Sequence, residues 1–140
     1  MQYSGMADTG EFPTVPESHR DLTDHKIGVL STVGSSGRPQ STAIWFMLGD
    51  DNKLRISLTD ERQKTKNMAA RPMATLFVID PLNPMRTLEV RADVSIAPDT
   101  DLAFMRAALS YYGADFDTFP APKEGRVIVT LTPRRVVANG

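Results

Sequence analysis

The sequence predicts a mainly β protein, a small closed or half-closed β-barrel with a few peripheral helices. Six or so apolar or alternating segments have the length of strands, and short turns rich in Gly, Asn and Asp join several of them. The G-x-G-x-x-G and P-loop patterns of parallel nucleotide-binding sheets are absent. Closure removes exposed strand edges, and a barrel this small is filled by its own side chains. We therefore expect a sizeable ligand in a surface cleft, at a dimer interface.

The first half of the chain indicates three strands in succession. Residues 27–33 are apolar and β-branched, and they run into the Gly-Ser-Ser-Gly turn of residues 34–37. Residues 40–48 form the second expected strand, and residues 49–52 form the next turn. In residues 53–59, leucine and isoleucine alternate with polar residues, which predicts one buried and one exposed face. Three strands joined by short turns predict an antiparallel meander.

Short helices are expected on either side of this meander. Residues 16–22 have a proline near the first turn and acidic residues early, which favours a helix start. A second helix is expected over roughly 61–70, and Pro72 ends it because proline excludes the helical conformation from the residue before it. A mostly apolar strand at 74–79 and a loop at 80–84 follow.

The second half predicts two more strands and a third helix. Residues 87–96 alternate, with the apolar side chains on one face. The Pro-Asp-Thr-Asp segment of residues 98–101 is typical of a helix start, and Gly113 is typical of the end of that helix. A last strand is expected over 126–131, with 136–137 as its extension.

Length and composition favour a single domain without disulfides. The chain has 140 residues, a formal net charge of −1 and no cysteine. We expect one domain over 14–140 and a flexible arm over 1–13, which is polar and without apolar period. His19 and His25 have no acidic cluster beside them, so no metal site is expected. The low charge and the lack of a long apolar segment give no reason to expect nucleic acid or a membrane as partner, and we expect a cytoplasmic protein.

The run from Thr59 to Asn67 is the strongest candidate for a binding site. It places three cations and several hydroxyl and amide groups between a strand and a helix start. Free backbone N–H groups and the helix dipole favour an anion there, and Arg and Lys are suited to phosphate oxygens. The alternative interpretation is a solvated, charged first turn of a surface helix.

Four segments together resemble a known family. They are Gly28–Thr32, Gly37–Ser41, Arg62–Asn67 and Ala74–Val78, in this order and spacing. They are similar to the pyridoxamine-phosphate-oxidase-like split β-barrels, whose strands are mostly antiparallel. More narrowly, they resemble the branch that uses the deazaflavin coenzyme F420 in place of FMN. The resemblance covers roughly residues 16–137.

The resemblance implies a homodimer that holds an extended, phosphate-bearing cofactor in a groove between subunits. A basic segment after the third strand holds the phosphate in this family, which corresponds here to Thr59, Arg62 and Lys64, with Ser57 on the same strand. The ring system lies against the second strand. The residues that this second contact would involve are Gln40, Ser41, Thr42, Ala43 and Trp45.

The activity that the resemblance implies is hydride transfer from reduced F420 to a conjugated small molecule, such as a quinone, an enone-like lactone or a tetrapyrrole. The cofactor supplies that chemistry, and no catalytic acid or base stands out in the sequence. FMN-dependent vitamin B6 oxidases carry a further C-terminal segment with substrate-phosphate ligands, so pyridoxamine-phosphate oxidase activity itself is not expected. Two alternatives remain, an FMN-binding flavoprotein of the same fold and a non-catalytic carrier of a flavin, haem or similar planar ligand.

Other candidate residues have structural interpretations. Arg86 and Arg91 could reach an acidic cofactor tail, but surface ion pairs are the expected role. Trp45 and Phe46 are adjacent and so point to opposite faces of their strand, one of them into the core. Four aromatic residues near the third helix are expected to complete the core or to cover a barrel end. They are Tyr111, Tyr112, Phe116 and Phe119.

Overall fold

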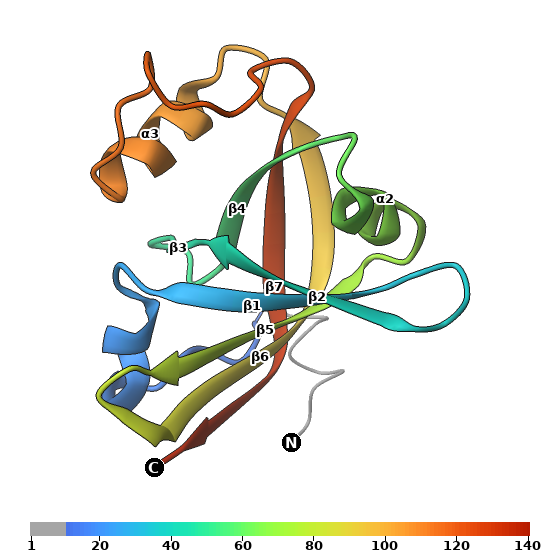
Figure 1. The fold of residues 1–140 in the computed structure, drawn as a ribbon. Coiled ribbons are helices and arrows are strands. Elements are labelled where there is room, and N and C mark those ends of the chain that lie inside the picture. The colour runs from blue at the N-terminus through green and yellow to red at the C-terminus, as the bar shows by residue number, and fades with distance from the viewer. Residues whose placement is uncertain (1–10) are drawn as a thin grey trace.

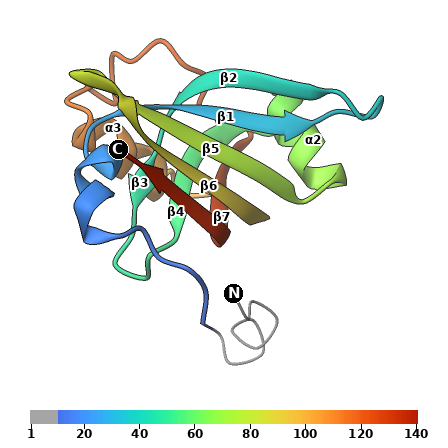
Figure 2. The same cartoon turned by 90° about the horizontal axis from the view of Figure 1, so that it is seen from below.

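The computed structural model describes residues 11–140, and most of the predicted arm, residues 1–13, lies outside the described residues. The predicted mainly β architecture is confirmed. Seven antiparallel strands form one curled sheet in the order β2-β1-β5-β6-β7-β4-β3 (Figures 1 and 2). The strands are β1 (Ile27–Val33), β2 (Pro39–Trp45), β3 (Met47–Leu48), β4 (Leu54–Thr59), β5 (Met73–Asp80), β6 (Asn83–Pro98) and β7 (Arg126–Asn139). The helices are the 3₁₀ helix η1 (Glu17–Thr23), α2 (Gln63–Ala70) and α3 (Ala103–Tyr111).

The expected meander of three neighbouring strands is wrong. The predicted strand 40–48 is divided at Phe46 into β2, which pairs with β1, and β3, which pairs with β4. β2 and β3 thus occupy the two ends of the sheet order although the chain connects them directly. Phe46 is buried, and a Cβ on Gly28 would lie 3.1 Å from its ring. The glycine therefore gives the ring room to enter the core where the chain passes from one end of the sheet to the other.

Two long strands carry the curvature of the sheet. β6 pairs with β5 along its first part and with β7 over most of its length, while the first part of β7 also pairs with β4. The register of the β6–β7 pair shifts between Arg91 and Ala92 of β6. At this point β7 contains one extra residue, Arg134. Such a bulge bends and twists a strand. Each long strand can therefore belong to both halves of the curled sheet (Figure 2).

The inner face of the sheet forms the core. β4 alternates as predicted, with Leu54, Ile56 and Leu58 buried and the residues between them partly exposed. Leu30, Leu76 and the inward residues of β6 and β7 belong to the same cluster, together with residues from η1, β2 and α2. Burying one such side chain contributes about 1.5–3 kcal/mol. The barrel is filled by its own side chains, so a ligand site must lie outside this core.

The helices begin and end at local signals. α3 starts at Ala103, later than the predicted start, because the Asp99 carboxylate accepts hydrogen bonds from the N–H groups of Phe104 (3.2 Å) and Met105 (2.9 Å) from the preceding turn. Gly113, with φ of 76°, follows the end of α3 as predicted. Within residues 11–140, none of the helices has both the length and the apolar character required to cross a membrane.

Candidate functional site

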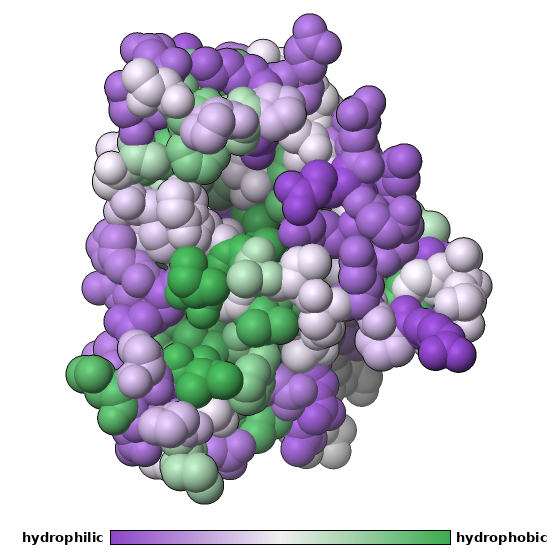
Figure 3. Space-filling view, viewed as in Figure 1, coloured by the Kyte–Doolittle hydropathy of each residue, from purple (hydrophilic) through white to green (hydrophobic). Residues whose placement is uncertain are grey.

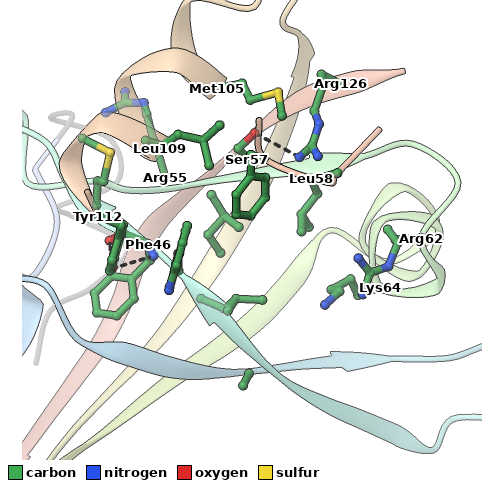
Figure 4. A pocket seen from close by; sticks show the side chains of 18 residues that line it. Phe46, Arg55, Ser57, Leu58, Arg62, Lys64, Met105, Leu109, Tyr112 and Arg126 are labelled. Carbon is green, nitrogen blue, oxygen red and sulfur yellow. Dashed lines mark hydrogen bonds between the residues drawn. The ribbon is translucent and has the colours of Figure 1, made fainter. Parts of the chain in front are cut away.

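A cavity of about 220 Å³ opens where β2 and β4 separate. Residues 43–47 form one wall and residues 55–58 form the other, while α3 and the segment after it add to the lining (Figure 4). β2 and β4 are not paired with each other: β2 pairs with β1 alone at one end of the sheet order, and β4 lies between β7 and β3. The split in the barrel therefore forms the pocket.

Lys64, in the first turn of α2, is a buried cation without a carboxylate partner among residues 11–140. The residue is 4% exposed, and its Nζ donates a hydrogen bond to Thr42 Oγ1 at 2.8 Å. Burial lowers the pKa of Lys64, and the nearby charge of Arg62 lowers it further. An ammonium group has three N–H donors, so two of them are available to a ligand.

Arg62 and Arg126 line the same cavity (Figure 4). Arg126, at the start of β7, donates from Nε to the carbonyl oxygen of Pro122 (2.7 Å) and from Nη1 to Ser57 Oγ (3.4 Å). Burial lowers the pKa of Arg126, the charge of Arg62 lowers it further, and Asp99 partly offsets both effects. Neither arginine forms an ion pair with a carboxylate in the described part of the chain.

Three cations therefore meet without an ion-paired carboxylate among residues 11–140, and Asp99 acts on one of them, Arg126, as an opposite charge. We call Arg62, Lys64 and Arg126 the cation cluster. Burial and mutual repulsion make such an arrangement unfavourable unless an anion joins it. Phosphate suits it because guanidinium groups bind phosphate oxygens in a fork and lysine adds a compact charge.

The remaining walls of the cavity are apolar and aromatic. Trp45 stacks on Tyr112 with ring centroids 4.6 Å apart and an interplanar angle of 3°, and Phe119 lies 5.8 Å from Trp45. The Tyr112 hydroxyl lies 2.7 Å from the carbonyl oxygen of Phe46 and accepts from its N–H at 3.1 Å. α3 contributes Met105 and Leu109. A planar ligand with an anionic end matches a cavity with flat apolar walls and cations at one end.

The predicted phosphate-binding residues are brought together in part. Ser57, Arg62 and Lys64 line the cavity. Thr59 does not belong to its lining; its carbonyl oxygen accepts a hydrogen bond from the Thr65 hydroxyl at 2.7 Å and so helps to fix α2. The sequence thus located the cationic turn, while Thr59 has a supporting position.

The predicted ring-binding residues of β2 divide between two faces. Ala43 and Trp45 line the cavity. Gln40 accepts a hydrogen bond from Asn67 of α2 (3.2 Å), as Thr42 does from Lys64. Ser41 is exposed, with its hydroxyl 2.8 Å from that of Ser31. Successive residues of a strand point to opposite faces, so the five residues cannot all face one ligand.

Arg126 and the α3 residues of the cavity were not among the predicted ligands. From the sequence, Arg126 was expected only to begin an apolar strand. The register of β4 and β7 sets it opposite Thr59 and so beside the cationic turn. The aromatic residues were expected to cover a barrel end, and Tyr112 and Phe119 do lie across the cavity. A long-range strand register has no signal in a single sequence.

Comparisons with known proteins agree with this geometry. A family model described as pyridoxamine 5'-phosphate oxidase matches residues 15–139. A solved F420 reductase is 39% identical, with 88% of this chain and 98% of that chain covered and a TM-score of 0.79.

More distant structures share the fold. A putative pyridoxamine 5'-phosphate oxidase from Listeria innocua is 19% identical, with 87% of this chain and 94% of that chain covered and a TM-score of 0.67. A heme binding protein from Mycobacterium smegmatis is 18% identical, with 91% of this chain and 56% of that chain covered and a TM-score of 0.68. No match was found among curated proteins. By the family model and the 39% identical structure, the chain is a split β-barrel that belongs to the pyridoxamine 5'-phosphate oxidase family.

Proposed function

We propose that the protein is an F420-dependent oxidoreductase that reduces a conjugated small molecule. The observation that carries the proposal is the cation cluster, which has no carboxylate partner within residues 11–140 and adjoins an aromatic, apolar cavity. The likeness to an F420 reductase supports the choice of cofactor. When bound, F420 supplies a hydride to an unsaturated acceptor.

The residues of this chain would bind and orient the cofactor. Arg62, Lys64 and Arg126 would hold the phosphate, with the Ser57 hydroxyl beside them. Trp45 would provide an apolar wall for the ring system, and α3 would exclude water from it. No side chain of the described cavity is required as an acid or base, because solvent can supply the proton that completes the reduction.

We also propose a homodimer that forms the cofactor groove with both subunits. β1 and β5, neighbours in the sheet, expose Ile27, Val29, Met73 and Ile79 on their outer face, each at least 36% exposed. Figure 3 shows apolar side chains gathered over this part of the sheet. Adjacent exposed apolar side chains of this kind are typical of interaction surfaces, and a second copy of the chain would cover them.

The FMN alternative differs in the charge of its phosphate. FMN carries a monoester whose second ionisation lies at a pKa of about 6, whereas the phosphate of F420 is a diester with a single charge. Three unpaired cations suit a dianion, which is the specific observation in favour of FMN. For FMN, affinity should rise as the pH increases through about 6; for F420 it should remain constant there.

Cofactor binding tests the proposal directly. Fluorescence of F420, and separately of FMN, is followed as each is titrated with wild-type protein and with Arg62→Ala/Lys64→Ala. We expect the double variant to bind F420 at least about 100-fold more weakly, because two charge-assisted contacts are lost. Lys66→Ala is the matched control, since Lys66 lies on the same helix but is exposed and outside the cavity lining.

Three results would contradict parts of the proposal. Equal binding by the double variant and the wild type would remove the site assignment. Tight binding of FMN with weak binding of F420 would favour the flavoprotein. Tight binding of F420 without oxidation of the reduced cofactor by any of a panel of quinones, enones and tetrapyrroles would favour a carrier.

A further inference from the structure

A fourth cation lines the cavity and differs from the cation cluster in its environment. Arg55 lies on β4 two residues before Ser57, so both side chains are on the same face of the strand. Figure 4 shows Arg55 beside Leu109 and Tyr112, across the cavity from Arg62 and Lys64. The proposed phosphate site therefore has a counterpart at the other end of the cavity.

Asp51, in the turn between β3 and β4, holds the guanidinium of Arg55 in place. Nη1 donates to Oδ1 at 3.0 Å and Nη2 to Oδ2 at 2.6 Å, and the backbone N–H of Lys53 also donates to Oδ1 at 3.1 Å. The hydrogen bonds from Arg55 lower the pKa of Asp51 to about 2. The pair is thus fully ionised and fixed by a two-point fork across the physiological pH range.

Gly49 leaves the space that this pair occupies. A Cβ at this position would lie 2.7 Å from both Arg55 Nη1 and Asp51 Oδ1. No real Cβ approaches polar atoms so closely, so a side chain at residue 49 would displace the fork. The turn is therefore compatible with the pair only because residue 49 is glycine.

The pair offers hydrogen-bond donors without net charge. A guanidinium has five N–H donors, and Asp51 accepts from two of them. The others have no acceptor within residues 11–140, and because the Arg55 side chain is 30% exposed and lines the cavity, they are accessible to a ligand. A second anion gains little there because Asp51 already balances the charge. A neutral oxygen acceptor, in contrast, can replace water at one of these donors without adding a charge to the balanced pair.

We propose that Arg55, held by Asp51, binds the carbonyl oxygen of the acceptor molecule. This inference rests on the proposed reductase function and narrows its acceptors to planar conjugated ketones, lactones or quinones. A carbonyl oxygen at Arg55 would orient the conjugated system along the aromatic wall of Trp45 and Tyr112. Conjugated compounds without such an oxygen would lack this contact.

The only tryptophan of the chain, Trp45, is a built-in reporter because it lines the cavity. Its fluorescence is followed during titration with menadione, a planar quinone, and with 2-methylnaphthalene, a hydrocarbon of similar shape. We expect Arg55→Met to weaken menadione binding about tenfold or more, the value of one charge-assisted hydrogen bond, and to leave hydrocarbon binding unchanged. Lys66→Met, on an exposed residue outside the cavity lining, should leave menadione binding unchanged.

Asp51→Asn distinguishes a ligand-binding role of Arg55 from a purely structural one. It removes the compensating charge, so we expect tighter binding of the anionic analogue 1,2-naphthoquinone-4-sulfonate than in the wild type. Thermal unfolding checks that each variant is folded. If Arg55→Met does not fold, Arg55→Lys replaces it, since lysine keeps the charge and loses the fork to Asp51.

The outcomes separate this inference from the proposed function. Unchanged menadione affinity in Arg55→Met, with cofactor binding still dependent on Lys64, would overturn the role of Arg55 alone. Menadione binding that depends on Arg55, with F420 binding independent of Lys64, would overturn the proposed cofactor site alone. Equal losses for menadione and for the hydrocarbon would show that Arg55 only shapes the wall, which also overturns the inference.

Discussion

Arg86 and the cation cluster, in which Lys64 is buried, Arg126 is half-buried and Arg62 is exposed, lie in opposite electrostatic surroundings. Arg86, near the start of β6, donates to Asp21 (3.0 Å) and to Asp80 (3.1 Å) from Nη1, and Nη2 donates to the carbonyl oxygen of Ser18. These contacts join η1 to the β5–β6 turn. The hydrogen bonds raise the pKa of Arg86 above its already high ordinary value.

The cation cluster shows the reverse. Lys64 is a buried residue and Arg86 a half-buried one, yet Lys64 lacks an ion-paired carboxylate in the described chain. Its pKa is lowered, whereas that of Arg86 is raised. A cation whose partners are all in the protein stabilises the fold, and a cation without them is available to a ligand. The expectation of an ion-pair role for Arg86 is confirmed, as it is for Arg91, which pairs with Glu89 at 3.0 Å.

The largest expected effect is that of Lys64→Met on cofactor affinity. Methionine fills the same volume without charge, so F420 affinity should fall about 10- to 100-fold. The apo protein should become more stable, because the variant no longer buries an uncompensated ammonium. Fluorescence titration and thermal unfolding measure the two effects, with Lys66→Met as control. A loss of both affinity and Tm would mean that Lys64 is a structural residue.

Arg126→Met should reduce F420 affinity by about tenfold, a smaller effect, because part of its guanidinium is already engaged by Pro122 and Ser57. Ser57→Ala should change affinity only a few-fold, since it removes a neutral hydroxyl. The same titration measures both. Unchanged affinity in Arg126→Met would remove Arg126 from the cluster and leave Arg62 and Lys64 as the site.

Arg86→Met should show the opposite pattern to Lys64→Met. The variant removes the donor that Arg86 supplies to Asp21, Asp80 and the Ser18 carbonyl oxygen, so Tm should fall while F420 affinity stays within twofold of wild type. Differential scanning calorimetry and the same fluorescence titration test this. Arg91→Met is the matched control on the same strand, because its exposed pair with Glu89 contributes little to stability. A fall in affinity would contradict the separation of the two clusters.

The pH dependence of stability gives the smallest effect. The pKa values of Asp21 and Asp80 are lowered below 3.8, mainly by the hydrogen bond from Arg86 and by the N–H of Leu82, respectively. Their stabilisation is therefore present above pH 3.8 and is lost as the pH falls through the lowered values. The pKa of Lys64 is lowered below 10.5. Its penalty is therefore complete at neutral pH and decreases as the pH rises towards 10.5.

Denaturant unfolding of wild type and Lys64→Met across pH measures this contrast. The variant should be the more stable protein at neutral pH, and the difference should shrink between the lowered pKa and pH 10.5. Arg86→Met should differ from wild type at neutral pH and converge with it in acid. A constant difference between wild type and Lys64→Met across the alkaline range would show that the pKa of Lys64 is the same in the native and unfolded states, which would contradict its lowered native pKa.

Local patterns were sufficient for most elements. Alternation in 53–59 predicted β4 and its buried face, and the Gly-rich turns predicted the hairpin after β1 and the turn before β4. The prediction failed at Phe46, where one apolar run serves two strands at opposite ends of the sheet. Its pattern is compatible with a continuous strand, and only closure of the barrel requires the break.

The sequence by itself determined where cations, strands and turns occur, since these follow from residue type and from contacts between near neighbours. It located Arg62 and Lys64 in a turn before a helix. The tertiary structure decided which cations remain unpaired, because pairing depends on partners far away in the chain. Register sets Arg126 beside Ser57, and folding gives Arg86 its two carboxylates. Charge compensation is a property of three-dimensional neighbours, and it distinguishes the candidate site from the scaffold.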